Sequence, residues 1–447
     1  MTDTTDSRGT AVPSNRLSRL WHLGRATGDL AAGVGFKGLI DIARTRNGGQ
    51  PARIQLSPEH TRRFTERLAR MRGAVMKMGQ LMSMDGSDIF TPEAAEIMSA
   101  LRDRSEPMPL SQLSRVLESE YGAGWNKQFK RLELTPIASA SIGQVHRAET
   151  KDGRRLALKI QFPGVRESID SDIDNLAFLG RSLGMAPKGI DIAPFLDEAR
   201  RQLHREADYA AEADAMDAYR DRLGDDADFF IPSVHRDLTT PSILAMDFAD
   251  GVPIDHLAGP DYRSAERDRA ATLLMRLTLR ELFELNLVQT DPNFANYLYD
   301  ADSGRIVLLD FGATKPVSPE LVEQFRNLAR SAIAEDRDGV RAACVGLGYV
   351  GETDPKQHVE AMMDLLQMAS EPLKHPGHYN FGTSDLFERV YHSGRDLFHS
   401  GVFTTAPDPE TMFLHRKFMG SFMLSRRLRA RVDLSEMARD CIGPMPS

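Results

Sequence analysis

The stretch NLVQTDPNFANYLYD, residues 286–300, and the VLLDFGAT that follows at 307–314 decide the fold class that this sequence predicts. Asp291 and Asn296 stand five residues apart, and Asp310 opens a D-F-G tripeptide after an apolar run. Each piece alone is ordinary, because turns of the Asp-Pro-Asn type are common in loops. In this order the pieces are typical of sites that hold magnesium and a nucleoside triphosphate. There Asp310 would bind Mg²⁺, Asn296 would complete the metal site, and Asp291 would orient a nucleophile or water.

Length and composition restrict the class of protein. A chain of 447 residues is long for one ordinary domain and predicts two lobes or more. Hydrophobic residues make up 41% and charged residues 27%, values typical of a soluble globular protein. The formal net charge of −8 argues against a general nucleic-acid binder, so we expect no nucleic-acid partner.

The cysteines and the N-terminal segment predict a reducing compartment. Cys344 and Cys441 lie far apart and match no metal-ligand spacing, so we expect two unpaired thiols. The N-terminal MTDTTDSRGTAVPSN is polar and carries two Asp residues, which argues against a signal or transit peptide. No apolar run in the sequence approaches the roughly 18 residues of an ordinary transmembrane helix. We therefore expect a cytoplasmic protein whose membrane association is peripheral, on the inner face of a membrane.

The first part of the chain has a polar tail followed by helical patterns. Residues 1–57 are expected to hold a disordered tail, an amphipathic helical segment at 16–46 and a linker rich in Gly and Pro. The segment at 16–46 could lie at a membrane interface or pack against other helices. Residues 58–125 are expected to form a helical extension, with helices at 59–84, 92–101 and 110–121.

The period of the apolar residues changes after this extension. RLELTPIASASIGQVHRAETKDGRRLALKIQF alternates apolar and polar residues, which predicts a β-hairpin around a Lys-Asp-Gly turn. Helical periods return at 166–186 and 191–221, FFIPSVHRDLTTPSILAMDFADG predicts two more strands, and from 260 onward the chain is mostly helical. This order predicts an α+β fold with an N-lobe at 126–250 and a helical C-lobe at 251–447.

Two features of the predicted N-lobe fit a phosphate site. The stretch ASASIGQV at 138–145 has small side chains that would let backbone N–H groups approach phosphate, and its candidate residues are Ala138, Ser139, Ala140, Ser141 and Gly143. Lys159 stands between Leu158 and Ile160 on the returning strand, where an interior lysine is costly unless a phosphate or carboxylate pairs with it. The alternative for Lys159 is a side chain that extends to the surface.

An acidic helix supplies candidate carboxylates for Lys159. EARRQLHREADYAAEADAM contains Glu198, Glu206, Asp208 and Glu212. We expect Lys159 to pair with Glu212, with Glu198 as the reserve candidate. LAMDFADG at 244–251 fits the connection between the lobes, where the backbone around Asp247 would pair with an adenine edge. The sequence has no G-x-x-x-x-G-K-[ST], which excludes a P-loop.

Taken together, these residues resemble the UbiB family of protein-kinase-like proteins. The glycine-rich loop of ordinary kinases is replaced by the alanine-rich ASASIGQVH, and H-R-D is replaced by QTD at 289–291. KMGQ at 77–80 matches the K-x-G-Q motif of the family, and EAD at 206–208 matches its E-x-D motif. QTDPNFANYLYD, LLDFGATK and FLHRKFMGSF are most similar to the branch required for coenzyme Q biosynthesis. The resemblance covers the chain from about residue 60 to residue 425.

The resemblance implies a bilobal protein-kinase-like fold that binds ATP with Mg²⁺. Its N-terminal helical extension would carry the K-x-G-Q motif over the place where a protein substrate would enter. Lys77 and Gln80 would engage Glu206 and Asp208, and together with Gly79 these residues would regulate the site. Lys77 and Gln80 would also take part in catalysis. Without the resemblance, a solvated helix residue is the favoured interpretation of Lys77.

The family also implies an ATPase with poor or absent protein-kinase activity, tied to isoprenoid-quinone metabolism at membranes. Ser139 departs from the family pattern, because alanine is usual there, and its hydroxyl would change nucleotide preference modestly. The sequence shows no pair of C-terminal transmembrane helices, which some relatives carry. The basic segment at 415–434 could meet anionic lipid or a partner, and a solvated face is an equal alternative.

We therefore predict an atypical kinase-like ATPase that binds and hydrolyses Mg·ATP and supports isoprenoid-quinone or other lipid metabolism at a membrane. Its partners would be ATP and ADP, with a lipid or isoprenoid-quinone precursor and partner proteins as further candidates. The alternatives are a nucleotide-gated scaffold with negligible turnover and a phosphotransferase that acts on a small molecule. Phosphate release that persists without an added acceptor would separate the ATPase from both.

Overall fold

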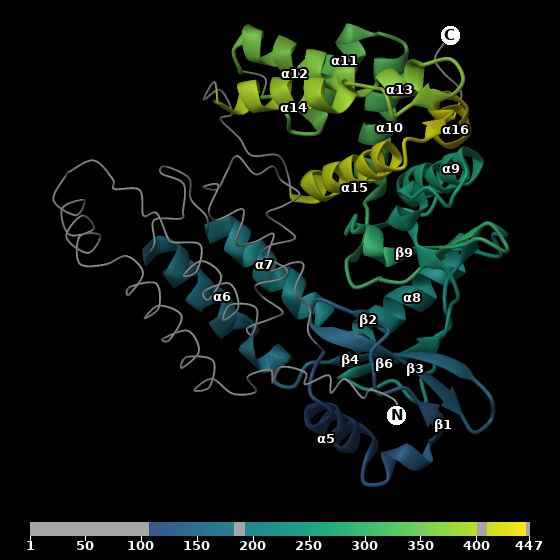
Figure 1. The fold of residues 1–447 in the computed structure, drawn as a ribbon. Coiled ribbons are helices and arrows are strands. Elements are labelled where there is room, and N and C mark those ends of the chain that lie inside the picture. The colour runs from purple at the N-terminus through teal and green to yellow at the C-terminus, as the bar shows by residue number, and fades with distance from the viewer. Residues whose placement is uncertain (1–106, 183–192, 352, 400–408, 444–447) are drawn as a thin grey trace, which may run out of the picture. The chain divides into compact units, whose positions relative to one another are not determined.

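The computed structural model describes residues 107–182, 193–351, 353–399 and 409–443 (Figure 1). These residues divide into two compact units. The first unit consists of the chain up to Asp214 together with Ser233–Phe248. The second unit consists of Ala215–Pro232 together with the chain from Ala249 onward.

Part of the expected architecture lies outside the described residues. This holds for the helices expected at 16–46, 59–84 and 92–101, and for Lys77, Gly79 and Gln80 of the K-x-G-Q motif. The helix expected at 110–121 is present as α5 (Leu110–Tyr121). It buries Leu113, Val116 and Leu117, which recur at the spacing of one helix face.

The first unit is built on an antiparallel sheet with the strand order β1-β3-β4-β6, and β2 pairs with β3. The strands are β1 (Phe129–Leu132), β2 (Ala138–Ser139), β3 (Gly143–Thr150), β4 (Arg155–Gln161) and β6 (Ile243–Asp247). β3 and β4 pair continuously from Gly143 and Gln161 to Glu149 and Arg155. The hairpin expected around the Lys-Asp-Gly turn is therefore confirmed.

β4 shows how its alternating sequence produces a strand with two different faces. Leu156, Leu158 and Ile160 are completely buried, and because side chains alternate along a strand they point to the same side of the sheet. Burial of each such side chain contributes about 1.5–3 kcal/mol. Lys159 lies between them in the sequence and therefore projects from the opposite face.

Three helices lie between β4 and β5 (Phe229–Phe230) in the chain. They are α6 (Val165–Ser182), α7 (Ala193–Glu206) and α8 (Tyr209–Leu223). The single helical pattern expected at 191–221 is thus divided into α7 and α8. The side chain of Asp208 accepts a hydrogen bond from the Ala211 N–H group (3.1 Å), so it caps the first turn of α8 and starts a new helix there.

The second unit contains short strands. A four-stranded sheet has the order β5-β10-β9-β7, and two strand pairs, β11-β8 and β12-β13, stand apart from it. The bounds are β5 (Phe229–Phe230), β7 (Val252–Pro253), β8 (Leu287–Gln289), β9 (Tyr297–Asp300), β10 (Arg305–Leu308), β11 (Thr314–Pro316), β12 (Tyr379–Asn380) and β13 (Arg431–Val432).

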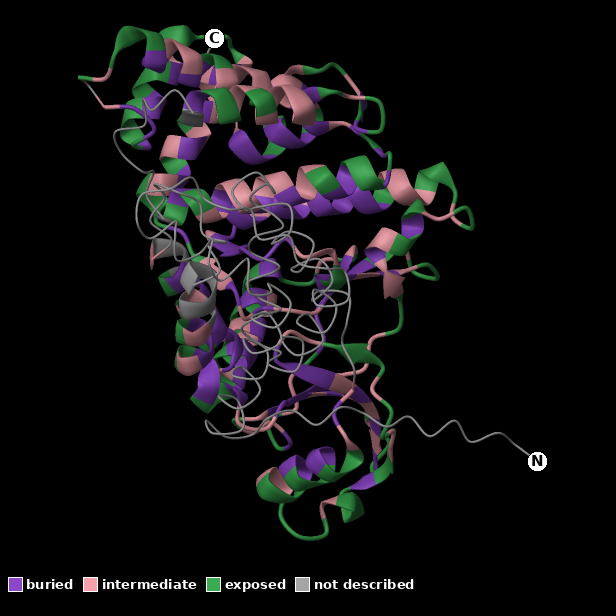
Figure 2. Ribbon diagram, turned by 60° about the vertical axis from the view of Figure 1, so that its left-hand side comes forward, coloured by how far each residue is buried: buried purple, intermediate pink, exposed green. Residues whose placement is uncertain are grey.

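Most of the second unit is helical, as the sequence predicts for residues from 260 onward. α9 packs against α15 and α16, and Figure 2 shows helices with one buried and one exposed face. The helices are α9 (Ser264–Phe283), α10 (Pro319–Ile333), α11 (Arg337–Gly346), α12 (Lys356–Ala369), α13 (Glu371–Lys374), α14 (Leu386–His399), α15 (Pro409–Arg427) and α16 (Leu434–Ile442). Within the described part of the chain, no helix is both long and apolar enough to cross a membrane.

We predict that Gly143→Ala destabilises the first unit by about 1–3 kcal/mol, the usual cost of forcing extra carbon into a packed site. A Cβ atom at Gly143 would lie 2.3 Å from the carbonyl oxygen of Ile160, which is part of the β4 backbone and cannot rotate away. Urea or thermal unfolding of the purified variant measures the change. Gly346→Ala is the control, because its Cβ would lie 3.5 Å from the nearest atom of Gln324. Wild-type stability of Gly143→Ala would contradict the close approach of β3 to β4.

Candidate functional site

Lys159 forms the ion pair that the sequence predicts. Its Nζ donates to both carboxylate oxygens of Glu212, at 2.7 and 2.9 Å. The Lys159 side chain is 11% exposed and that of Glu212 is completely buried. The Nζ also lies 5.2 Å from the centre of the Tyr209 ring. The pair fixes the ammonium group on one face of the sheet. Glu212, and not the reserve candidate Glu198, is therefore the carboxylate partner of Lys159.

The small-residue stretch forms a tight turn from β2 into β3. Ala138 and Ser139 pair with Val145 and Gln144, and the Ala140 N–H group donates to the Gly143 carbonyl oxygen (2.9 Å). Ser139 is exposed on this hairpin. The role of this turn in binding nucleotide stays a prediction.

Ser141 makes a contact that sequence reasoning missed. Its hydroxyl donates to the carboxylate of Glu206 at 2.5 Å, and Glu206 is 9% exposed. Near by, the side-chain amide of Gln161 donates to the Ala207 carbonyl oxygen (2.9 Å). Both bonds hold the E-x-D segment against the sheet. The signal for Gln161 was available, because it lies two residues after Lys159 and so shares its face.

Gln144 and His146 of the same motif have structural partners. Gln144 accepts from the Met108 N–H group (2.9 Å) and its amide lies 2.6 Å from the His146 ring. His146 also contacts the Glu133 carbonyl oxygen at 2.8 Å, and burial lowers the pKa of this histidine. These residues therefore connect β3 to the chain before α5 and to the segment after β1.

Asp247 does not offer its N–H group or its carboxylate to a ligand in this structure. The N–H group donates to the Ser233 carbonyl oxygen (2.9 Å), and the carboxylate accepts from the Ser233 N–H group and lies 2.7 Å from His235. Burial alone would raise the pKa of Asp247, but the bonds from His235 and Ser233 outweigh it, so the pKa is lowered. An adenine contact at Asp247 stays a prediction without support from this geometry.

The second unit brings together the three residues of the opening motif. Asn296 ends a short 3₁₀ turn, Phe294–Asn296, and its carbonyl oxygen accepts from the Leu309 N–H group (3.0 Å), directly before Asp310. The Asn296 amide nitrogen lies 3.3 Å from the Asp291 carbonyl oxygen and 3.5 Å from the Asp291 carboxylate. Antiparallel pairing of β9 with β10 therefore places Asn296 and Asp310 at the same end of the sheet.

A second connection joins the Asp291 segment to the D-F-G segment. Thr290 donates both its N–H group and its hydroxyl to the Ala313 carbonyl oxygen, at 3.1 and 2.7 Å. The strand pair of β8 with β11 continues this contact. Asp291 is thereby anchored on one side by Thr290 and on the other by Asn296.

This donor set fits a magnesium ion. Mg²⁺ keeps several waters and is held by one or two protein carboxylates together with substrate phosphates, so it needs few protein ligands. The Asn296 amide nitrogen faces Asp291, which directs its amide oxygen away from that carboxylate. Asp310 and the Asn296 oxygen would therefore supply the ligands, and the ion would neutralise charge on phosphate.

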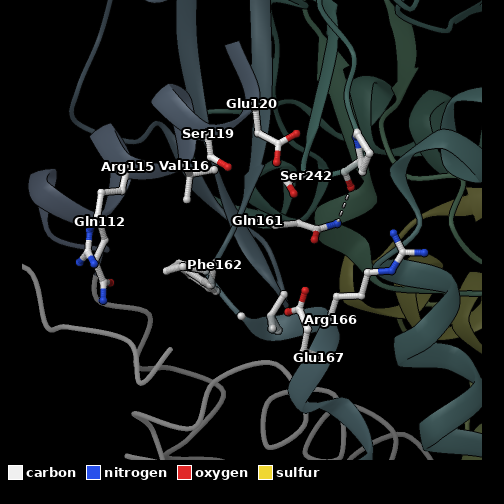
Figure 3. Close-up of a pocket in the computed structure, with 14 residues that line it drawn as sticks. Gln112, Arg115, Val116, Ser119, Glu120, Gln161, Phe162, Arg166, Glu167 and Ser242 are labelled. Atoms are coloured by element: carbon white, nitrogen blue, oxygen red, sulfur yellow. Dashed lines mark hydrogen bonds between the residues drawn. The ribbon is translucent and has the colours of Figure 1, made fainter. Parts of the chain in front are cut away.

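A cavity of about 410 Å³ lies in the first unit (Figure 3). In it the Gln161 amide donates to the Pro241 carbonyl oxygen at 3.5 Å. Its described lining residues come from α5, the end of β4, the start of α6 and the loop before β6: Gln112, Arg115, Val116, Ser119, Glu120, Gln161, Phe162, Pro163, Gly164, Val165, Arg166, Glu167, Pro241 and Ser242. None of these is a predicted nucleotide-site residue, but Gln161 pairs with Gly143 across β3 and β4.

Comparison with known proteins identifies the family. The ABC1 atypical kinase-like domain matches residues 100–344, a stretch that contains both the Lys159–Glu212 pair and the Asp291–Asp310 segment. The chain belongs to the ABC1 atypical kinase-like family. Membership confirms the resemblance to the UbiB family that the sequence motifs indicated, and it implies a nucleotide substrate.

Curated relatives of the ABC1 family cover nearly the whole chain. It is 34% identical over 440 residues to the atypical kinase COQ8B, mitochondrial, of Rattus norvegicus, covering 97% of this chain and 82% of the relative. It is 34% identical over 441 residues to the atypical kinase COQ8, mitochondrial, of Saccharomyces cerevisiae, covering 97% of this chain and 86% of the relative. These relatives confirm the coenzyme Q branch as the part of the family that the sequence resembles.

A solved structure supports the fold. The Mycobacterium tuberculosis protein Rv3197, determined in complex with erythromycin, matches with a TM-score of 0.60 and 25% identity, covering 86% of this chain and 95% of that one. Together with the ABC1 match, it confirms the predicted kinase-like α+β fold. The K-x-G-Q part of that prediction lies outside the described residues.

We predict that Lys159→Ala destabilises the first unit by about 3–5 kcal/mol, because it leaves the buried Glu212 carboxylate without its cation. Urea unfolding followed by circular dichroism measures the loss. Lys130→Ala is the matched control: Lys130 pairs with Glu149 at 2.5 Å, but its side chain is 63% exposed. An exposed pair of this kind contributes about 0–1 kcal/mol. Equal losses in the two variants would contradict a special cost for the buried pair.

Proposed function

We propose that this protein binds Mg·ATP and hydrolyses it, as an atypical kinase-like ATPase that supports isoprenoid-quinone or other lipid metabolism at a membrane. The observation that carries the proposal is the arrangement of Asp291, Asn296 and Asp310: pairing of β9 with β10 brings Asn296 and Asp310 to one end of a sheet, and the Asn296 amide contacts Asp291. The Lys159–Glu212 pair supports it from the first unit, as does ABC1 family membership.

Residues of the first unit would act on the phosphates. Lys159 is held by Glu212 at the level of the sheet, so its ammonium group would meet phosphate with little loss of side-chain freedom. The turn through Ala138, Ser139, Ala140, Ser141 and Gly143 has side chains small enough for backbone N–H groups to approach phosphate oxygens.

Residues of the second unit would act on the metal and on the attacking group. Asp310 and Asn296 would hold Mg²⁺, which neutralises the charge that develops on phosphate. Asp291 is 8% exposed and would orient a water molecule for hydrolysis through its carboxylate. Lys77 and Gln80 would regulate access by engaging Glu206 and Asp208, with Gly79 between them in the motif.

The proposed link to lipid metabolism rests on the relatives rather than on the site. COQ8 and COQ8B are among the relatives that align with most of this chain, and the chain resembles the UbiB branch of coenzyme Q biosynthesis. A quinone and lipid profile of a deletion strain, with the wild-type gene restored as the control, tests the link. Unchanged quinone and lipid levels in the deletion strain would contradict it.

We predict that Asp310→Asn removes Mg²⁺-dependent ATP binding and lowers ATP hydrolysis by at least about 100-fold, because the variant loses the carboxylate that faces the metal. A thermal-shift titration with Mg·ATP measures binding, and release of inorganic phosphate without an acceptor measures turnover. Asp302→Asn is the matched control, because Asp302 is exposed in the turn after β9. It should behave as the wild type in both assays.

Each outcome separates one of the three functions. Phosphate release by the wild type without any acceptor supports the ATPase. Mg·ATP binding without phosphate release would favour the nucleotide-gated scaffold, and release that requires an added small molecule would favour the phosphotransferase. An undiminished Mg·ATP shift in Asp310→Asn would refute the assignment of the metal site.

A further inference from the structure

A buried ion pair lies in the interior of the second unit, outside the residues so far assigned to chemistry. The Lys417 Nζ in α15 lies 2.7 Å from the Glu281 carboxylate in α9, and the two side chains are 3% and 1% exposed. The basic segment at 415–434 was expected to meet lipid, a partner or solvent, and Lys417 does none of these. Its charge is instead used inside the protein.

Lys417 and Glu281 each hold one end of the Asp291–Asn296 loop. Glu281 accepts a hydrogen bond from the Gln289 N–H group (3.2 Å), two residues before Asp291. Lys417 donates to the hydroxyl of Tyr297 (3.2 Å), directly after Asn296. One ion pair thus connects the entry and the exit of the loop that carries the predicted catalytic residue Asp291 and the predicted metal ligand Asn296.

Tyr219 links the Glu281 carboxylate to the D-F-G segment. The Tyr219 hydroxyl donates to Glu281 at 2.7 Å, and the Tyr219 ring meets Phe311 edge-on with 5.1 Å between centroids. Phe311 directly follows Asp310 and is 1% exposed. The three segments that carry Asp291, Asn296 and Asp310 therefore converge on Glu281 and Lys417.

Helix α15 also supports the loop by direct packing. A Cβ atom at Gly420 would lie 2.0 Å from the Cβ of Pro292, the residue after Asp291. Gly420 lies one helical turn after Lys417, so the face of α15 that bears the lysine is the face that meets the loop. Because Gly420 has no side chain, α15 can lie this close to Pro292.

The pKa shifts of Glu281 and Lys417 indicate that each charge depends on the other. Burial raises the pKa of Glu281, against the lowering effect of Lys417. Burial alone would lower the pKa of Lys417, but the Glu281 carboxylate and the Tyr297 hydroxyl outweigh it, so the pKa of the lysine is raised. Each group therefore needs the other to remain charged in this interior.

We propose that Glu281 and Lys417 are positioning residues, which set the geometry of the Asp291–Asn296 loop for the reaction by fixing both of its ends. The proposal rests on the proposed function, since it assumes that this loop performs the chemistry. It goes further by assigning a role to two residues that touch neither nucleotide nor metal.

The test compares three variants of the full-length chain with the wild type. Tyr297→Phe removes only the hydroxyl bond to Lys417, Lys417→Met removes the cation, and Glu281→Gln/Lys417→Met replaces the ion pair by two neutral side chains. Lys374→Met is the matched control, because Lys374 pairs with the exposed Glu335 in the same unit. Two readouts are taken: kcat and KM for Mg·ATP hydrolysis, and hydrogen–deuterium exchange of the peptide spanning residues 287–299.

We expect kcat to fall roughly 10- to 100-fold in Lys417→Met and in the double variant, because an ångström-scale misplacement of catalytic groups has effects of this size. Tyr297→Phe should show a smaller loss, KM should change less than about threefold in all variants, and the loop peptide should exchange faster. Lys374→Met should match the wild type in every measurement. A residue that served stability alone would leave kcat unchanged at temperatures where the variant is folded.

Opposite results would overturn the proposal. Folded Lys417→Met or Tyr297→Phe with wild-type kcat and wild-type exchange of the loop peptide would show that the ion pair does not position the loop. If Lys417→Met does not fold, Tyr297→Phe and the double variant decide. If the wild type shows no turnover, the proposed function fails, and the exchange measurement alone decides whether Glu281 and Lys417 hold the loop.

Discussion

Glu281 places a carboxyl group at the end of α9 with almost no exposed surface, and its neighbours are arranged to satisfy it. Lys417 supplies the opposite charge, while Tyr219 and the Gln289 N–H group donate hydrogen bonds to the same carboxylate. A buried charge without such partners would cost several kcal/mol, so losing any one of these contacts should destabilise the second unit. Because they come from α8, α15 and β8, the carboxylate constrains how widely separated parts of the second unit pack.

The first unit shows the same physical device on a smaller scale. Glu212 is buried and Lys159 is its cation, and strand alternation places the lysine opposite the apolar face formed by Leu156, Leu158 and Ile160. The two pairs serve different ends. Lys159 keeps some exposure and could meet a phosphate, whereas Lys417 is closed off and can act only on the protein. A lysine buried on an acidic partner is therefore no evidence of a ligand site by itself.

Local sequence patterns predicted much of the fold. The alternation in β3 and β4 with a Lys-Asp-Gly turn predicted the hairpin, and the apolar spacing at 110–121 predicted α5 with its bounds. The Lys159–Glu212 contact was also predicted, because an interior strand lysine needs a carboxylate. The break at Asp208 was not, since a periodic pattern hides one capping residue, although Asp before a helix is a known start signal. The burial of Lys417 was not predicted, because a basic segment normally faces solvent.

The sequence by itself determined the motif order, the family and the residue types that could hold a nucleotide and Mg²⁺, because these depend on identity and spacing along the chain. Only the tertiary structure decided that Lys417 pairs with Glu281, that Ser141 donates to Glu206, and that Gly420 lets α15 meet Pro292. These contacts join residues far apart in sequence. They are selected by the cost of burying an unpaired charge or overlapping atoms, and neither cost can be read from a local pattern.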